Sequence, residues 1–433
     1  MAHQDKSTDF EKRFHEYLGR LAKSLNHRDR HEPLKAYIKG LCLSGERKSI
    51  EPMAAKIDPF HVQARHQSMH HFVANATWND TAVLSVARDY VLEPMHHHGG
   101  VLAWVVDDTG NPKKGNHSAG VARQYCGQLG KTENCQVAVS ISLANEAISI
   151  PAAYQLYLPE SWIKDPNRRQ KTGIPKNAVF KPKWQIALDN IARLRDGGVP
   201  TAPVLADAGY GNATGFRDQL TDWHIPYVVG INPETTVWQP GTMPLLPIRI
   251  HRRGRPPIRL RRDAEHKPLD ALTVAMRLDK TAWKDVTWRE GTKGKMTSRF
   301  AALRIRPAHC DTQMTKPRDE EWLLIEWPRA EKKPTKFWLS TMPADIKFEE
   351  IVRTAKMRWR IERDYEELKD EFGLNHFEGR GWRGFHHHAS LCIAAYAFMA
   401  AERARFSPSG VKAIFKATPL PKSFRPRGSP DTP

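Results

Sequence analysis

The first hundred residues carry apolar side chains at helical spacing. Large apolar residues recur three or four positions apart, with Glu, Lys and Arg between them, at Phe10, Phe14, Tyr17, Leu18, Leu21 and Leu25. A period near 3.6 residues predicts an amphipathic helix. Similar segments predict helices at 34–42, 53–64 and 81–95, and the run His96-His97-His98-Gly99-Gly100 interrupts the pattern. We therefore expect a helical N-terminal domain over residues 1–98.

From residue 101 the hydrophobic pattern becomes that of strands. Residues 101–106 form an apolar run, and the runs at 136–143 and 147–158 predict an antiparallel hairpin. Residues 159–180 are rich in Pro, Lys and Asn and predict a loop. Helical and strand-like segments then alternate at 184–194, 203–206, 214–223 and 226–231. This order predicts an α/β sheet of mixed direction.

The pattern changes again after residue 231. Short β-like runs at 246–250, 272–278, 300–305, 322–327 and 336–341 predict a β-rich insertion over 232–348. A long helix is expected over 348–372 and another over 387–405. Residues 406–433 contain several Pro, Lys and Arg and predict a flexible basic tail. The expected domains are thus 1–98, a core of 99–231 with 349–405, the insertion 232–348, and the tail.

Charge is the first indication of function. The 433 residues carry 67 Lys and Arg against 48 Asp and Glu, a net +19 that indicates a polyanionic partner such as nucleic acid. No apolar run approaches the ~18 residues of a membrane span. The N-terminal stretch MAHQDKSTDFEKRF has no apolar core of a secretory signal, and five scattered cysteines predict no disulfide scaffold. We expect a cytoplasmic protein without a membrane partner.

Acidic residues mark the candidate chemistry. Asp107 and Asp108 are expected to end one strand, and Asp207 another, at the edge of an α/β sheet where sites form. An Asp after a strand is also a common turn former. Further along, Arg358, Glu362, Tyr365 and Lys369 are spaced by four, three and four residues, which places them on one stripe of a helix. An ordinary solvated face with Glu–Arg and Glu–Lys pairs would give the same spacing.

These motifs resemble the transposases of bacterial insertion sequences in the DDE superfamily, of the IS-four type and especially the IS-seven-hundred-one type. The stretches that carry the resemblance, over about residues 30–405, are DDTGNPKKGNHSAGVARQYCGQLGK, LADAGYGN, RWRIERDYEELKDEFG and HFEGRGWRGFHHH. The family's Tyr-x2-Arg-x3-Glu-x6-Lys pattern falls on Ala355, Arg358, Glu362 and Lys369, so only the tyrosine is missing. Its first acid precedes a threonine, which implies Asp108 rather than Asp107, and its second corresponds to Asp207.

The resemblance implies a ribonuclease-H-like catalytic core interrupted by the β-rich insertion, with the helical residues 1–98 as a DNA-binding domain. Asp108, Asp207 and Glu362 would then be catalytic residues that bind Mg²⁺ or Mn²⁺, with two ions expected, since hard cations take oxygen ligands. The implied activity is cut-and-paste transposition: binding of terminal inverted repeats, cleavage of DNA phosphodiesters, and transfer of the 3′-OH ends to target DNA. A homodimer in the DNA complex and a location at the bacterial nucleoid follow. Two alternatives stay open, a metal-dependent nuclease of the same fold and a domesticated DNA-binding protein without catalysis.

Several basic residues are candidate DNA contacts. Arg358 and Lys369 flank Glu362 and would meet the phosphodiester backbone. Lys113 and Lys114 either touch DNA or belong to a solvated loop. Arg252 and Arg253 begin the densest basic run, for which phosphate binding is the preferred interpretation. His386, His387, His388 and Cys392 are expected on different helix faces, in a structural or DNA-contacting role rather than a metal site.

Overall fold

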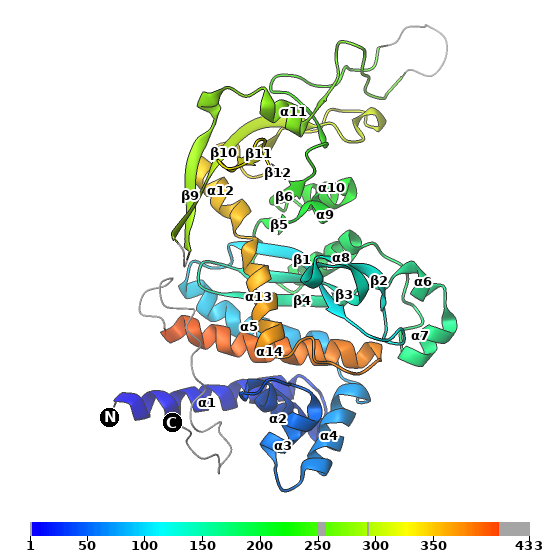
Figure 1. Ribbon diagram of the computed structural model, residues 1–433, viewed down its shortest axis with the longest axis vertical. Coiled ribbons are helices and arrows are strands. Elements are labelled where there is room, and N and C mark those ends of the chain that lie inside the picture. Colours follow the sequence, from blue (N-terminus) through cyan, green and yellow to red (C-terminus); the bar gives the residue numbers. More distant parts are fainter. Residues whose placement is uncertain (1, 249–256, 292–293, 407–433) are drawn as a thin grey trace. The chain divides into compact units, whose positions relative to one another are not determined.

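The computed structural model describes residues 2–248, 257–291 and 294–406 (Figure 1). Arg252 and Arg253, together with the tail from residue 407, lie outside the described residues. Within the described residues the chain divides into two compact units. The first contains the residues up to Pro200 and those from Arg360 on, and the second contains Thr201–Trp359. Helices and strands alternate in a mixed α/β fold, as the sequence predicts.

The N-terminal part of the first unit is helical, as expected. Its helices are α1 (Ala2–Lys23), α2 (His31–Cys42), α3 (Ile50–Ile57), α4 (Val62–Ala74) and α5 (Asp80–His97). The single helix expected over 53–64 is wrong: α3 ends at Ile57, because Pro59 disfavours helical geometry at Asp58. The apolar stripe of α1 is buried, and its Tyr17 hydroxyl donates to the carbonyl of Ala394, 2.8 Å away.

Ala394 belongs to α14 (Trp382–Phe406), a helix buried along most of its length. Helices α2, α4 and α5 pack against it, and it also contacts strand β4 (Figure 1). The N-terminal helices therefore share one core with the sheet of the first unit. No helix in the described part of the chain is both long and apolar enough to cross a membrane.

The sheet of the first unit is antiparallel and centred on β3 (Lys131–Ala144). It pairs with β1 (Ala103–Pro112), β2 (Ala122–Cys126) and β4 (Ser149–Leu156), and the β3–β4 hairpin is the one predicted. Helix α8 (Lys183–Asp196) packs on β3 and β4. The segment expected to be a loop over 159–180 contains the short helices α6 (Glu160–Ile163) and α7 (Pro166–Thr172), the second capped by Asp165.

Strand β1 is longer than predicted. The sequence predicted an apolar strand over 101–106 that Asp107 and Asp108 end, but all residues from Ala103 to Pro112 pair with β3. The prediction was wrong because the hydrogen-bonded pairing of β1 with β3 continues beyond the apolar run, where polar residues of β1 lie opposite residues of β3. Asp107 and Asp108 consequently lie inside a strand.

The second unit holds a mixed sheet. Strands β5 (Val204–Ala206) and β6 (Tyr227–Ile231) are parallel and are joined through α9 (Ala208–Gly211) and α10 (Thr214–Asp222). From β6 the order continues through β12 (Lys336–Ser340), β11 (Glu321–Trp327), β10 (Gly294–Pro307), β7 (Thr236–Trp238) and β8 (Leu269–Asp270), and β9 (Lys284–Gly291) pairs with β10. The β-rich segment after residue 231 therefore extends the sheet that contains β5 and β6.

Two element predictions for this region are wrong. The β-like run at 272–278 is the helix α11 (Ala271–Met276), whose first turn is capped by the Asp270 side chain accepting from Thr273 N at 2.7 Å. Leu246 and Ile248, at the start of another expected run, lie outside the strands. Short apolar runs do not distinguish a strand from a short helix.

The long helix expected over 348–372 is two helices, α12 (Phe348–Lys356) and α13 (Trp359–Asp370). Their side chains are anchored in different units. Lys356 of α12 pairs with Glu326 of β11 at 2.6 Å in the second unit, whereas Asp364 of α13 is bound within the first. Arg358 lies in the turn between the helices, so it does not share a helical stripe with Glu362 as predicted.

Candidate functional site

The two acids of β1 face opposite sides of the sheet, because side chains alternate along a strand. Asp107 is paired with Ser140 of β3, and Ser140 Oγ lies 2.8 Å from the hydroxyl of Tyr365 on α13. Burial raises the pKa of Tyr365 well above its usual value, and the charge of Asp107 adds to this rise. Asp107 therefore faces α13, the helix that carries Glu362.

Asp108 has a different environment on the other face of β1. Its Oδ2 accepts from Nζ of Lys183, the first residue of α8, at 2.9 Å. Both side chains keep about a third or less of their surface exposed. Lys183 thus places an ammonium group against Asp108 and supplies positive charge on this face of β1.

Helix α13 is fixed by a buried carboxylate. Asp364 accepts from Ser142 Oγ and Ser149 Oγ, each at 2.7 Å, and from the hydroxyl of Tyr396 at 3.0 Å. Desolvation raises the pKa of Asp364 to about 6, although the three hydroxyl donors lower it. This network joins α13 to β3, β4 and α14, and it determines which side of α13 remains exposed to solvent.

Glu362 lies on that open side. It is exposed, as is Glu366 one turn later, whereas Ile361, Asp364 and Leu368 are buried. An exposed carboxylate beside the Asp107 face of β1 can bind a cation or a polar group of a ligand.

Lys369 is more enclosed than its sequence pattern indicates. Its Nζ donates to the Gly110 carbonyl of β1 and to Gln128 Oε1, each at 3.1 Å. Burial lowers its pKa to about 8. The Glu362 stripe is therefore only partly solvated. Lys369 connects α13 to β1 at Gly110, two residues after Asp108 and three after Asp107.

Asp207 belongs to the second unit, at the end of β5 as predicted. Its Oδ1 accepts from Gly209 N at 2.9 Å and Tyr210 N at 3.3 Å, so it caps the short helix α9. A side chain at Gly211 would overlap the carbonyl of Gly230 in β6, and this close approach fixes the turn after Asp207. Asp207 can therefore form this turn and still take part in the expected binding of a metal ion.

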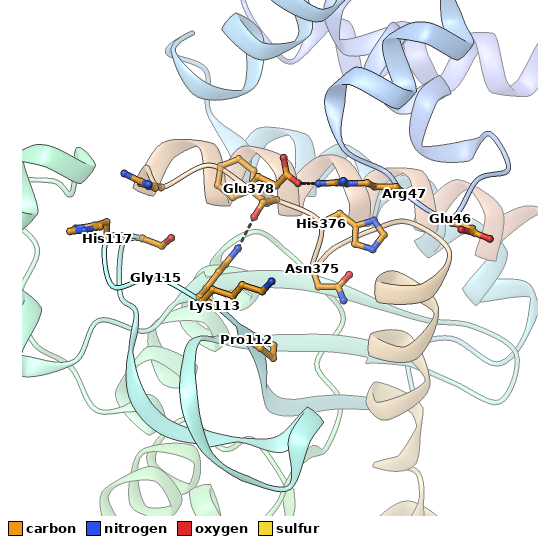
Figure 2. Close-up of a pocket in the computed structure, with 13 residues that line it drawn as sticks. Glu46, Arg47, Pro112, Lys113, Gly115, His117, Asn375, His376 and Glu378 are labelled. Carbon is orange, nitrogen blue, oxygen red and sulfur yellow. Dashed lines mark hydrogen bonds and ion pairs between the residues drawn. The ribbon is translucent and has the colours of Figure 1, made fainter.

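The remaining basic candidates of the first unit are Lys113 and Lys114, which follow β1. Both line a polar pocket, and Lys113 Nζ donates to the Phe377 carbonyl at 2.6 Å (Figure 2). Burial lowers the pKa of Lys113. The solvated-loop alternative therefore does not describe Lys113.

The histidine run of α14 is structural. All three of its histidines are buried: His386, His387 and His388. The Nδ1 atom of His388 accepts a hydrogen bond from the Tyr37 hydroxyl, and its Nε2–H donates to the Gly373 carbonyl, both at 2.9 Å. Burial lowers its pKa to about 4, so the ring is neutral. The expected separation from Cys392 is wrong, because positions i and i+4 share a helix face and Cys392 Sγ lies 3.5 Å from His388 Nε2. In the part of the chain that the structure describes, no three His, Cys, Asp or Glu side chains gather as a metal cluster.

Sequence reasoning missed Asp364 and Lys183. Asp364 carries the clearest local signal, an acid on the apolar side of α13, which is costly without hydrogen-bond donors. Lys183 carries none, because nothing in the sequence relates the start of α8 to Asp108.

Comparison with known proteins places the chain in a family. The profile described as "DDE superfamily endonuclease" matches residues 20–295, more than half of the chain, and the protein belongs to this family. The match includes Asp107, Asp108 and Asp207 and ends before α13. The chain is also similar to the "Probable transposase for insertion sequence element IS701" of Microchaete diplosiphon, with 28% identity over 191 residues. That alignment covers 44% of this chain and 46% of the relative, so the chain spans about half the length of the curated protein it matches.

Proposed function

We propose that the protein is a DNA transposase. In this proposal it binds the terminal inverted repeats of an insertion sequence, cleaves DNA phosphodiesters and joins the 3′-OH ends to target DNA by a cut-and-paste route. The observation that carries the proposal is the position of the acids. Strand β1 carries Asp107 and Asp108, and it is bonded through Lys369 to α13, the helix whose exposed side bears Glu362. Family membership and similarity to a probable IS701 transposase support it.

The proposed fold of the catalytic part is ribonuclease-H-like. The antiparallel strands β1, β2 and β3, followed by helices and the parallel strands β5 and β6, agree with that topology. In this reading residues 232–348 are an insertion ahead of α13, and residues 1–98 contribute to DNA binding. A homodimer on DNA and a location at the bacterial nucleoid belong to the same proposal.

The proposed ligands of Mg²⁺ or Mn²⁺ are Asp108, Asp207 and Glu362. All are carboxylates, the donors that hard divalent cations prefer. Two such ions held by these residues would supply activation of the attacking hydroxyl and stabilisation of the leaving oxygen in an in-line displacement. Lys183 would neutralise Asp108 until a cation binds, since it donates to the same Oδ2.

A specific observation favours Asp107 as the alternative first acid. The Asp-Thr pattern selects Asp108, but the strand register places Asp107 on the α13 face through Ser140 and Tyr365. The two assignments make opposite predictions for single substitutions, which are given in the Discussion.

The proposed DNA contacts are Arg358, Lys369, Lys113, Lys114 and, outside the described residues, Arg252 and Arg253. Lys369 would contact a phosphate directly if its ammonium gave up the bond to the Gly110 carbonyl. If it kept that bond, it would act by holding β1 in place beside the DNA. The net charge of +19 supports a contact with many phosphates.

The test is a strand-transfer assay with Mg²⁺ and a duplex that ends in the inverted repeat bracketing the coding region. A transposase joins a precut 3′ end to a second DNA. Cleavage without joining would support the nuclease alternative, and binding of the repeat without either reaction would support the non-catalytic alternative.

A further inference from the structure

A polar pocket of about 690 Å³ lies within the first unit, next to the end of β1 (Figure 2). Three chain segments form its walls: residues 46–47 between α2 and α3, residues 112–118 after β1, and residues 375–380 between α13 and α14. Its volume is in the range of ligand-binding pockets and far exceeds what a single small ion fills. The last two segments lie at the end of β1, which carries Asp108, and a few residues after α13, which carries Glu362.

The charge of the lining fits an anion. Four lining residues are permanently basic and two are acidic, a net +2: Arg47, Lys113, Lys114 and Arg380 against Glu46 and Glu378. His117 and His376 add further nitrogen atoms. Because the basic groups come from all three segments, positive charge lies on each wall of the pocket, which suits the negatively charged phosphates of a nucleic acid strand.

The pocket is held together by its own bonds, so the basic groups are positioned before any ligand arrives. Lys113 Nζ donates to the Phe377 carbonyl at 2.6 Å, and Ala119 N donates to the Arg380 carbonyl at 2.9 Å. Lys48 N donates to His376 Nδ1 at 3.0 Å. The neutral ring of His376 therefore carries its proton on Nε2 and can act as a donor.

Two groups in the pocket have incomplete or competing partners. The buried Oδ1 of Asn375 has no hydrogen-bond partner within the described residues. Arg47 is paired with Glu378, and both side chains are about two-thirds exposed (Figure 2). An exposed ion pair of this kind contributes little to stability and is readily exchanged for a phosphate.

We infer that this pocket binds phosphates of the DNA backbone, about five base pairs from the phosphate that is cleaved. Lys113 follows Asp108 by five residues, or about 17 Å at about 3.4 Å per strand residue. B-form DNA rises about 3.4 Å per base pair, so the same length covers about five base pairs. The inference rests on the proposed function for its DNA substrate and adds the place where the backbone is gripped.

The test compares three pocket variants with a matched control. Lys114→Gln and Arg380→Gln each remove a positive charge from the pocket, and Glu378→Gln removes the acid that pairs with Arg47. Lys171→Gln removes an exposed charge on α7, outside the pocket. Binding of a terminal-repeat duplex is measured by fluorescence anisotropy in EDTA, between 50 and 200 mM salt, with circular dichroism as a folding control.

The expected effects have opposite signs. Lys114→Gln and Arg380→Gln weaken binding by about tenfold each and reduce the slope of log affinity against log salt by about 0.9. Glu378→Gln strengthens binding and steepens the slope, because Arg47 is released. Lys171→Gln matches the wild type. If the pocket had only a structural role, Glu378→Gln would not be expected to strengthen DNA binding.

Neutral methylphosphonates then locate the contact. One such substitution four to six base pairs from the cleaved phosphate should weaken the wild type but not Lys114→Gln. The inference would be overturned if all three pocket variants bound DNA as Lys171→Gln does. It would also be overturned if the variants lost affinity for inorganic phosphate but kept full affinity for DNA. Because EDTA removes catalysis from the assay, these outcomes leave the proposed reaction untouched, whereas a wild type that binds no duplex contradicts the proposed function itself.

Discussion

The adjacent acids of β1 differ at the scale of single atoms, and this difference is testable. Asp108→Asn should abolish cleavage of a terminal-repeat duplex, because an amide is a poor ligand for Mg²⁺, whereas Asp107→Asn should be milder. Cleavage is measured at single turnover, and Mn²⁺ binding by electron paramagnetic resonance gives a readout that does not depend on activity. Reversed results would transfer the ligand role to Asp107, whose side chain faces α13.

Lys369 provides a second prediction for a single residue. Lys369 is buried, so keeping its ammonium out of water costs stability, and burial lowers its pKa to about 8. Lys369→Met should therefore leave the melting temperature unchanged or raise it, while cleavage falls about ten- to a hundredfold through loss of a charged contact. The measurements are calorimetry and single-turnover cleavage. Loss of stability with full activity would make Lys369 a structural tether of β1.

At the scale of elements, the Asp364 network predicts how the packing of α13 responds to pH. The pKa of Asp364 is raised to about 6 in the folded protein, above the usual value of 3.8. Between these values the folded state binds more protons than the unfolded state, so the Asp364 contribution to stability is present below pH 4 and is lost as the pH rises through 6. The loss is at most about 3 kcal/mol.

Asp364→Asn is the variant that isolates this effect. Its free energy of unfolding should change less between pH 4 and 6.5 than that of the wild type, since the amide does not titrate. Urea denaturation at several pH values measures the difference, and other titrating groups cancel in the comparison. Equal pH profiles for the two proteins would show that Asp364 is not the group responsible.

Elements that bury one continuous stripe were predictable from the sequence. Helix α2 and the β3–β4 hairpin appear where their periodicity placed them. The failures occur where tertiary contacts decide: polar residues continue β1 because β3 pairs with them, and the turn at Arg358 divides a helix whose parts are anchored by Glu326 and Asp364. The pairing of Lys183 with Asp108 joins residues 75 positions apart, and no local pattern encodes it.

At the scale of the whole molecule, the relevant property is the excess of basic residues. The chain carries a net charge of +19, and its basic side chains occur in both units and in the part outside the described residues. Many of those in the first unit are engaged with carboxylates, as Arg13 is with Glu402 at 2.7 Å. These ion pairs leave the net charge of +19 unchanged, because it already counts the carboxylates, but they reduce the number of basic side chains that can contact phosphates. The number of contacts has to be measured by DNA binding itself.

The last prediction is that DNA affinity falls steeply with salt. Each phosphate neutralised by Lys or Arg releases condensed counterions, so log affinity should decrease linearly with log salt, by about 0.9 per contact. With six to ten contacts, affinity for a terminal-repeat duplex falls about 10³- to 10⁵-fold between 50 and 200 mM salt. The titration is done in EDTA so that Mg²⁺ does not compete for phosphates. A scrambled duplex is the control, and it should bind more weakly with a slope of similar size, because phosphate contacts carry no sequence information. A nearly flat plot for the terminal repeat would contradict a phosphate-dominated interface, and the +19 charge would then need a different polyanionic partner.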